Sequence, residues 1–588
     1  MPSNFSRRNL MLASALAAMG SYAQSAQAAR GEHHDHDDGP TLNRFATTVK
    51  GAEITGLFLT AGGQLFFNVQ HPSEENDVHE GYQQGAVGHL CGFNMHNLPE
   101  DFESVQLPKN ESQREQVRTA RGSYEFLAHG GETLSNGELL GIPTSPEGEP
   151  LTEGMNPDFN GFVPATTVEP SGRGRTPGRE GYLFTNWEAR PGAMTRLHLK
   201  QRGNHYEVVD RMNVDFSGVE GTWVNCFGSV SPWNTPLTSE ELYFDNTADW
   251  NNSDYGYIDG VENLAAHLGY YPNPYRYGYI VEITEPESDD PTPQKLTPMG
   301  RFSHENSVVM PDERTVYLSD DGTGTVFFKF VADVPGDLTA GTLYAAKASQ
   351  DRGTDYNTVG FDLDWLELAH GSTDEIEAWI AEYDGITQDD YVAGENSYIT
   401  DAEIEAWARG EADDDRVAFL ESRKAAEAVG ATAEFRKMEG VNIKRDARPG
   451  DYLYMAMSAV TKTMADDEGE IQLADNEYGA VYRMRLGADY DVSRMEPVVT
   501  GGPNANVCGG CPYDASPDSA NNACQDCAHN PKNEENDGFA TFSSQDQDPD
   551  NTIANPDNLV VMDDGRVIIG EDSGLHDNNM IWVYNPGE

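Results

Sequence analysis

The chain has 588 residues, of which 98 are Asp or Glu and 39 are Lys or Arg, for a formal net charge of −59 at pH 7. This charge argues against a nucleic-acid partner, and 38% hydrophobic with 10% aromatic residues argue against a disordered chain. The acid excess suits a surface that stays hydrated in high salt, as in halophilic proteins. It also suits sites for hard cations such as Ca²⁺, which prefer carboxylate oxygens.

The N-terminus is typical of an export signal. Residues 6–11, Ser-Arg-Arg-Asn-Leu-Met, form a twin-arginine motif, followed by an apolar stretch and a small-residue cleavage site at 26–28. We therefore expect 1–29 to be a signal peptide for the twin-arginine translocase, which carries folded proteins, and a periplasmic or extracellular location. No other segment has the ~18 apolar residues of a membrane helix. Residues 30–43 are acidic and histidine-rich; they could bind a transition metal, but their composition favours a solvated leader.

Short strands separated by acidic or glycine-rich turns recur along the rest of the chain. The clearest pair is 308–324 and 559–574, and these segments continue into further strands at 325–331 and 580–585. Similar segments occur at 54–72, 179–188, 277–283, 450–460 and 479–486. Such repeats predict an all-β fold, a single propeller of about six blades over residues 44–588.

Two segments interrupt this pattern. From about residue 365 to 430, apolar residues recur at spacings of three and four, which predicts a helical insertion with Thr400 and Glu403 near one helix start. Residues from about 501 to 550 are rich in Asn, Asp, Pro and Cys, and they predict a long Cys-rich loop on the propeller.

Four of the six cysteines fall in that loop with the spacing C-x2-C-x12-C-x2-C. They are Cys508, Cys511, Cys524 and Cys527. Four thiolates at this spacing can hold a tetrahedral ion, usually Zn²⁺, or they can form two disulfides in an oxidising compartment. Either arrangement is structural, because four thiolates leave no open position on an ion.

A lone cysteine, Cys226, lies in GTWVNCFGSVSPWNTPLTSEE (221–241), which ends in Glu240 and Glu241. A lone cysteine is most often a small buried hydrophobic residue. A metal site is the alternative, because carboxylates from several blades gathered at one rim would repel unless cations neutralise them. The other candidates at strand ends are Asn186, Glu188, Glu305, Asp557 and Asp572. Thiolate with carboxylate suits iron, and carboxylate with amide oxygen suits calcium.

Motifs spread over most of the mature chain resemble the PhoX-type alkaline phosphatases. They are GGQLFFNVQHP (62–72), NCFGSVSPWNTPLTSEE (225–241), GRFSHE (300–305), VYLSDDGTGTVFFKFV (316–331), SRKAAEAVGATAEFRKMEG (422–440) and NPDNLVVMDDGRVIIGED (555–572). The resemblance implies a six-bladed propeller with an iron and calcium centre, on which an oxo or hydroxo group attacks small phosphate monoesters for phosphate scavenging. It implies metal ligation first by Cys226, Glu241, Glu305 and Glu439, next by Asp557 and Asp572, and more weakly by Glu240, Asn186 and Glu188.

The chain also departs from the family's pattern. Family members carry Arg-Pro-Glu where this chain has Arg436-Lys437-Met438-Glu439, so Arg436 or Lys437 would hold the phosphate, and lysine lacks the bidentate fork of arginine. Ser239 stands where we expect cysteine. The NVQHP segment lies near the N-terminus instead of the C-terminus, which implies a circular permutation. Two other functions therefore stay open: a phosphodiesterase or lactonase on the same fold, and a non-catalytic binding protein stabilised by calcium.

Overall fold

Antiparallel meanders of short strands build most of the chain in the computed structural model. The structure describes residues 40–73, 76, 80–166, 179–203, 205–244, 246–503 and 551–587. The predicted signal peptide, residues 30–39 of the predicted leader and the four loop cysteines lie outside the described residues. The prediction of a mostly β fold is confirmed, because strands alternate with turns over nearly the whole described length.

Three sheets have four strands each, and in each of them neighbouring strands follow the order of the chain. The first contains β2 (Glu53–Leu59), β3 (Leu65–Gln70), β4 (Ala86–Cys91) and β6 (Ser123–His129). The second contains β7 (Pro157–Pro164), β8 (Glu180–Trp187), β9 (Ala193–Arg202) and β10 (His205–Asn213). The third contains β11 (Asn225–Val230), β12 (Pro236–Glu240), β13 (Ile280–Thr284) and β14 (Thr292–Lys295).

The remaining sheets are larger or smaller. A nine-stranded sheet joins two meanders through β20 and β25, in the order β15 (His304–Val309), β16 (Thr315–Asp320), β18 (Phe328–Val334), β19 (Asp337–Gln350), β20 (Phe361–Ser372), β25 (Arg494–Thr500), β24 (Ala480–Arg485), β23 (Tyr452–Met457) and β22 (Met438–Ile443). A five-stranded sheet contains β26 (Pro556–Val561), β27 (Val567–Glu571), β28 (Met580–Asn585), β1 (Thr41–Thr47) and β5 (Arg118–Thr119). The strands β17 (Thr323–Thr325) and β21 (Phe435–Arg436) form a small pair.

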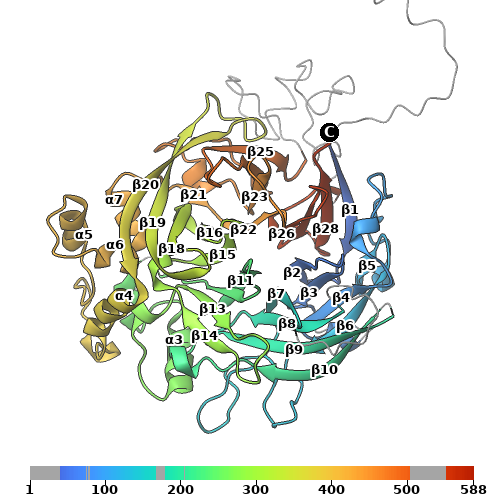
Figure 1. Ribbon diagram of the computed structural model, residues 1–588, viewed down its shortest axis with the longest axis horizontal. Coiled ribbons are helices and arrows are strands. Elements are labelled where there is room, and N and C mark those ends of the chain that lie inside the picture. The colour runs from blue at the N-terminus through green and yellow to red at the C-terminus, as the bar shows by residue number, and fades with distance from the viewer. Residues whose placement is uncertain are drawn as a thin grey trace, which may run out of the picture. The chain divides into compact units, whose positions relative to one another are not determined.

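The first strands of the meanders form a closed ring, which makes the fold propeller-like. Each first strand contacts the next, in the order β2, β7, β11, β15, β22 and β26, and β26 contacts β2 again. Figure 1 shows these labels around the centre. The strand β1, from the start of the described chain, pairs with β28 from its end, with Thr41 opposite Asn585 and Thr47 opposite Met580. The two ends of the chain therefore complete one sheet.

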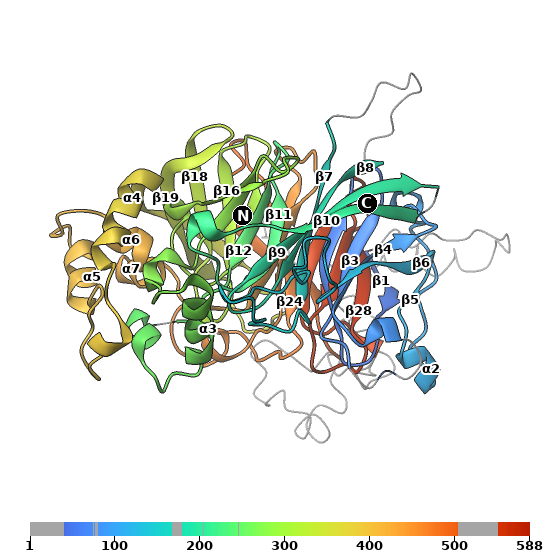
Figure 2. The same ribbon diagram turned by 90° about the horizontal axis from the view of Figure 1, so that it is seen from below.

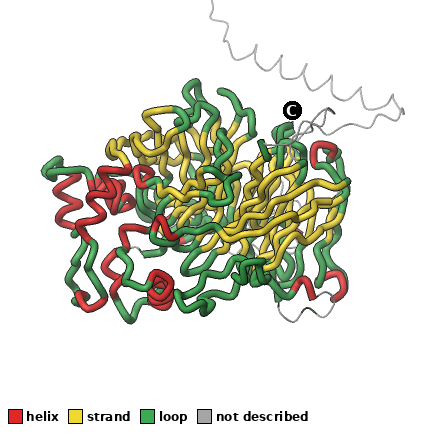
Figure 3. Tube along the Cα trace, turned by 60° about the horizontal axis from the view of Figure 1, so that its bottom comes forward, coloured by secondary structure: helices red, strands yellow, loops and turns green. Residues whose placement is uncertain are grey.

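Helices cover one outer side of the sheets, as Figures 2 and 3 show. They are α4 (Thr373–Ile380), α5 (Asp401–Ala408), α6 (Arg416–Leu420) and α7 (Ser422–Ala428), with α3 (Ile258–Leu268) and the short α2 (Glu111–Arg114) elsewhere. The side chains of Ile376, Ile404 and Phe419 are buried in one hydrophobic cluster with strand residues such as Phe328. Thr400 and Glu403 form the expected capping box at the start of α5.

The start of the helical insertion differs from the prediction at residue 365. The segment from Trp365 to Ser372 belongs to β20, which pairs with β19 along most of its length. Pairing with the long partner strand outweighs the local spacing of apolar residues, so the first helix begins only at Thr373. No helix among the described residues is long and apolar enough to cross a membrane.

The C-terminal ends of these first strands line an apolar cavity of about 420 Å³. Its lining includes Leu57, Phe162, Phe227, Val308 and Val560. The N-terminal ends of the same strands carry mostly carboxylates instead.

Candidate metal centre

Two rows of polar residues occupy equivalent positions around the ring. At the start of the inner strands lie Glu53, Asp158, Cys226, Glu305, Glu439 and Asp557. Directly after the second strands lie His71, Glu188, Glu241, Asp321, Ser458 and Asp572. Because the strands of each meander are antiparallel, the start of the first strand and the end of the second meet at the same edge. The repeat therefore gathers these side chains at one end of the ring of inner strands.

A β-bulge turns five of the inner-strand residues toward the centre. In β7, for example, Pro157 pairs with Trp187 and the register then shifts before Asn160, so that Asp158 stands in the bulge. The same shift follows the first pair in β11, β15, β22 and β26. Bulges re-aim side chains and are frequent next to functional sites.

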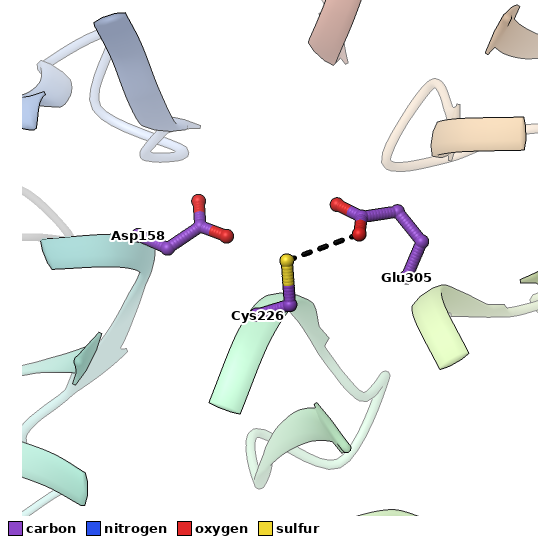
Figure 4. Close-up of side chains that lie close together, drawn as sticks. All are labelled: Asp158, Cys226 and Glu305. Carbon is purple, nitrogen blue, oxygen red and sulfur yellow. Dashed lines mark hydrogen bonds between the residues drawn. The ribbon is translucent and has the colours of Figure 1, made fainter. Parts of the chain in front are cut away.

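These donors approach closely enough to share cations. Three groups have ligand atoms that all lie within 4.8 Å of one another: Asp158–Cys226–Glu305, Glu188–Cys226–Glu241 and Glu305–Glu439–Asp557. Figure 4 shows Asp158, Cys226 and Glu305 pointing toward one another from three neighbouring strands. Cys226 is 7% exposed and donates a hydrogen bond of 3.0 Å to Glu305 Oε2. Since Cys226 and Glu305 each belong to two groups, the three groups form one connected centre.

The buried carboxyls resist ionisation when no cation is present. Burial, together with Glu439 and Glu241, holds the pKa of Glu305 well above its ordinary value. Burial and Glu439 do the same to Asp557, and burial raises the pKa of Glu439 to about 7. Burial, Glu305 and Glu241 also raise the pKa of the Cys226 thiol. Such a set of buried, mutually repelling acids is the expected signature of a site that binds positive charge.

One lysine enters this centre. Lys437 Nζ lies 2.9 Å from Asp321 Oδ2 and 3.2 Å from Glu439 Oε1. Burial opposes the charge of Lys437, but Asp321 and Glu439 hold its pKa above its ordinary value. Its backbone φ is +48°, an uncommon conformation for lysine. The side chain keeps 32% of its surface exposed, so it stands at the mouth of the centre.

Its neighbour Arg436 points elsewhere. The guanidinium donates to Thr461 Oγ1 at 2.9 Å and also to Thr323 Oγ1, both outside the acidic centre. Of the two cations that the sequence left open for holding phosphate, Lys437 is the one that contacts the carboxylates. The pairing of β21 with β17, Thr323 opposite Arg436, fixes this arrangement.

Two weaker ligand candidates take other positions. Glu240 accepts hydrogen bonds from the backbone N–H groups of Trp223, Gly278 and Tyr279 and from Lys295 Nζ at 3.0 Å. These four bonds occupy both of its carboxylate oxygens, so the structure does not bring Glu240 into the donor groups. Asn186 is fully buried, and its side-chain amide donates to the carbonyl oxygen of Cys226, which supports the bulge behind the thiol.

Sequence reasoning missed several members of the two rows. Asp158 is the last residue of an Asn-Pro-Asp tripeptide, and so is Asp557. Asp321 takes the place in 308–324 that Asp572 takes in the matching segment 559–574. Comparison of the repeats with one another would therefore have found both residues. His71, whose ring Nε2 lies 2.7 Å from Glu53 Oε1, ends its repeat segment in the NVQHP motif and could be found in the same way, whereas Glu53 lies just before that segment.

Asp321 joins the two rows to the rim of the site. Its Oδ2 accepts hydrogen bonds from Lys437 Nζ and, at 2.6 Å, from Tyr243 Oη. Burial works against its ionisation, but the charge of Lys437 and hydrogen bonds with Lys437, Glu241 and the backbone of Gly322 hold the pKa of Asp321 below its ordinary value. Asp321 therefore stays charged and fixes the direction of the lysine.

Comparison with known proteins gives one family. A family model described as alkaline phosphatase PhoX matches residues 192–588, more than half of the chain. A solved structure of PhoX from Pseudomonas fluorescens, in complex with vanadate, a transition state analogue, is 18% identical with a TM-score of 0.50, and the match covers 92% of this chain and 87% of that chain. This likeness shows the fold. A search of curated proteins found no match.

Two other solved structures are similar only at a level that carries no argument. A family 43 beta-xylosidase/alpha-arabinofuranosidase from a compost microbial metagenome is 9% identical with a TM-score of 0.25, covering 56% of this chain and 96% of its own. A putative 6-phosphogluconolactonase from Bacteroides uniformis is 8% identical with a TM-score of 0.22, covering 81% and 88%.

Proposed function

Because the chain belongs to the PhoX family of alkaline phosphatases, we propose that it is an exported enzyme that hydrolyses phosphate monoesters at a centre of iron and calcium. The observation that carries the proposal is the set of three linked donor groups around Cys226 and Glu305. These groups lie at the N-terminal ends of the inner strands. The PhoX family is metal-dependent. Phosphate scavenging is the role that such an activity would serve.

The donors present fit these metals. Cys226 supplies the thiolate that suits iron, next to the carboxylates of Glu241 and Glu305. Glu439 and Asp557 share a group that contains only carboxylates, which suits calcium. Asp158 and Glu188 belong to the linked groups, and we assign Asp572 to the same centre from its place in the second row. When bound, such cations polarise phosphoryl oxygens and lower the pKa of a water molecule that can act as nucleophile.

The protein's own groups then hold and orient the ester. Lys437, fixed by Asp321 and Glu439, presents a positive charge at the mouth, where it can pair with a phosphoryl oxygen as negative charge develops there. Burial of the ring keeps bulk water away from the carboxylates, which strengthens every charge interaction inside the site.

Three further properties belong to the proposal. We count six blades by dividing the nine-stranded sheet between β20 and β25. We also propose a circular permutation, because β1 completes the sheet that contains β28. Superposition of an experimental structure on a PhoX enzyme would test both, and a different order of equivalent strands would overturn the permutation. Export by the twin-arginine route predicts that replacing Arg7 and Arg8 with lysine leaves the protein inside the cell.

The experiment is an assay with matched substrates. Purified mature protein is given a phosphomonoester, the corresponding phosphodiester and a lactone, each with and without a calcium chelator. Faster turnover of the monoester, lost with the chelator and restored by Ca²⁺, supports the proposal. Preference for the diester or lactone would assign the site to another hydrolase. Folded, calcium-containing protein that turns over none of them would identify a binding protein.

A further inference from the structure

An arginine next to the metal centre forms no ion pair with any carboxylate in the described part of the chain. Arg190 follows Glu188 by two residues, yet it forms no hydrogen bond or ion pair there, and its Nε is buried without a partner. In a chain with 98 acids against 39 Lys and Arg residues, carboxylates were abundant candidates for pairing. Arg301, another arginine of the fold, donates to the carbonyl oxygens of Pro274, Tyr277 and Leu420.

The fold holds this side chain in place by aromatic contacts and not by an ion pair. The Arg190 guanidinium carbon lies 4.7 Å from the ring centre of Tyr257 and 5.6 Å from that of Trp223. Its stem passes so close to Gly260 that a Cβ there would stand 2.5 Å from Arg190 Cδ. Cation–π contacts of this kind orient an arginine while leaving its N–H groups available.

A second buried donor lies beside it. Trp223 Nε1 is also buried without a hydrogen-bond partner. Arginine and tryptophan side chains carry donors and no acceptor, and buried polar groups are normally satisfied in native structures. The complement of these two residues is therefore a group that offers hydrogen-bond acceptors, and the positive charge of the guanidinium favours an anionic one.

The position of Arg190 separates this anion from the transferred phosphoryl group. Its partner Tyr257 stacks on Tyr243 with ring centres 6.0 Å apart, and Tyr243 Oη is bonded to Asp321, the residue that fixes Lys437. Arg190 thus lies across two tyrosine rings from the lysine but only two residues from Glu188 of the centre. We propose that Arg190 is a specificity-determining residue that binds a second anionic group, a carboxylate or phosphate carried by the leaving group of the ester. This inference rests on the proposed phosphatase function.

The test compares two esters that differ in one charge. Phenyl phosphate and 4-carboxyphenyl phosphate are assayed with the metal-loaded wild-type enzyme and with Arg190→Gln. The ratio of kcat/KM for the carboxylated over the plain ester should fall about 10- to 100-fold, since bonds to charged groups are the stronger ones. Gly260→Ala, which keeps the arginine but displaces its stem, should lower the same ratio. Arg202→Gln, at an exposed ion pair with Glu207, is the matched control and should not change it.

Two results would overturn the inference: an unchanged ratio in Arg190→Gln, or an equal loss for both esters with the melting temperature and metal content preserved. Titration with the non-hydrolysable phenylphosphonate and 4-carboxyphenylphosphonate separates this inference from the proposed function. Arg190-dependent preference for the carboxylated phosphonate without turnover of either ester would overturn the phosphatase and keep the anion site. Turnover without an Arg190-dependent preference would do the reverse.

Discussion

Cys226 Sγ and Glu305 Oε2 lie 3.0 Å apart, although 79 residues separate them in the chain. Both residues occupy the bulge at the start of their inner strand, β11 and β15 respectively. Burial and the surrounding carboxyls raise the pKa of both groups, so a proton is held between them in the absence of metal. Metal binding must displace this proton, and affinity should therefore fall as pH falls.

The first prediction concerns the thiolate. Cys226→Ser should lower the iron content at least about tenfold while leaving calcium bound, because a hydroxyl is a far poorer ligand for iron than a thiolate. Elemental analysis of protein purified without added metal measures this. Cys91→Ser, at the end of β4, is the control and should keep the wild-type metal content. Equal iron in both variants would show that Cys226 is a packing residue.

The second prediction separates the two neighbouring cations. Lys437→Met should lower kcat/KM for a phosphomonoester about 100-fold, because it removes a charge directed at the reacting group. Arg436→Met should have little effect, since Arg436 is bonded to Thr323 and Thr461. Steady-state kinetics on metal-loaded enzymes decides between them. A larger loss in the Arg436 variant would reverse the assignment.

The third prediction concerns the pH dependence of stability. Folding raises the pKa of Glu439 from 4.5 to about 7. Between these values the folded, metal-free protein binds more protons than the unfolded chain, so its stability should fall as pH rises from about 4.5 to about 7. Other ring carboxyls with raised pKa values act in the same direction.

Thermal unfolding with chelator and with Ca²⁺ measures this dependence. Bound cations replace the protons, so the calcium-loaded protein should lose the fall, and Glu439→Gln should reduce it in the metal-free protein. A metal-free melting temperature that rises over this pH range would contradict the assignment of these acids to one repelling cluster.

The fourth prediction concerns the link between the helical insertion and the centre. Arg423, on α7, donates to both oxygens of Asp320 and, at 2.8 Å, to the backbone carbonyl oxygen of Asp321. Arg423→Leu leaves Asp320 buried without its partner, which should cost about 3 kcal/mol of unfolding free energy. Chemical denaturation measures the loss. Arg409→Leu, on the exposed surface of the insertion, is the control and should leave stability unchanged; a similar loss in both variants would argue against a specific clamp.

The sequence predicted the β fold and much of the centre for identifiable reasons. Strand and turn patterns depend on local propensity, and they placed the strands around 308–324 and 559–574 correctly. Cys226, Glu305 and Glu439 were found because they stand within recognisable motifs. The structure brings these residues together in linked groups of candidate metal-ligating side chains.

What the sequence could not predict depends on tertiary contacts. Glu240 and Glu241 are adjacent in the sequence but face different surroundings. Only the strand geometry shows that Glu240 binds Lys295 and that Glu241 joins a donor group of the centre. The bulges that aim Asp158 and Asp557 inward are set by pairing with a second strand. Arg190 lies in none of the recognised motifs, and only the unpartnered Nε in the folded chain draws attention to it.

The most direct test of the central claim is anomalous X-ray diffraction at the iron absorption edge from crystals of the purified protein. We predict a peak about 2.3 Å from Cys226 Sγ, the usual metal–thiolate distance, with Glu305 or Glu241 as a further ligand and no hydrogen bond left between Cys226 and Glu305. A well-ordered centre without an anomalous peak, in which Cys226 still donates to Glu305 as at 3.0 Å here, would contradict the account.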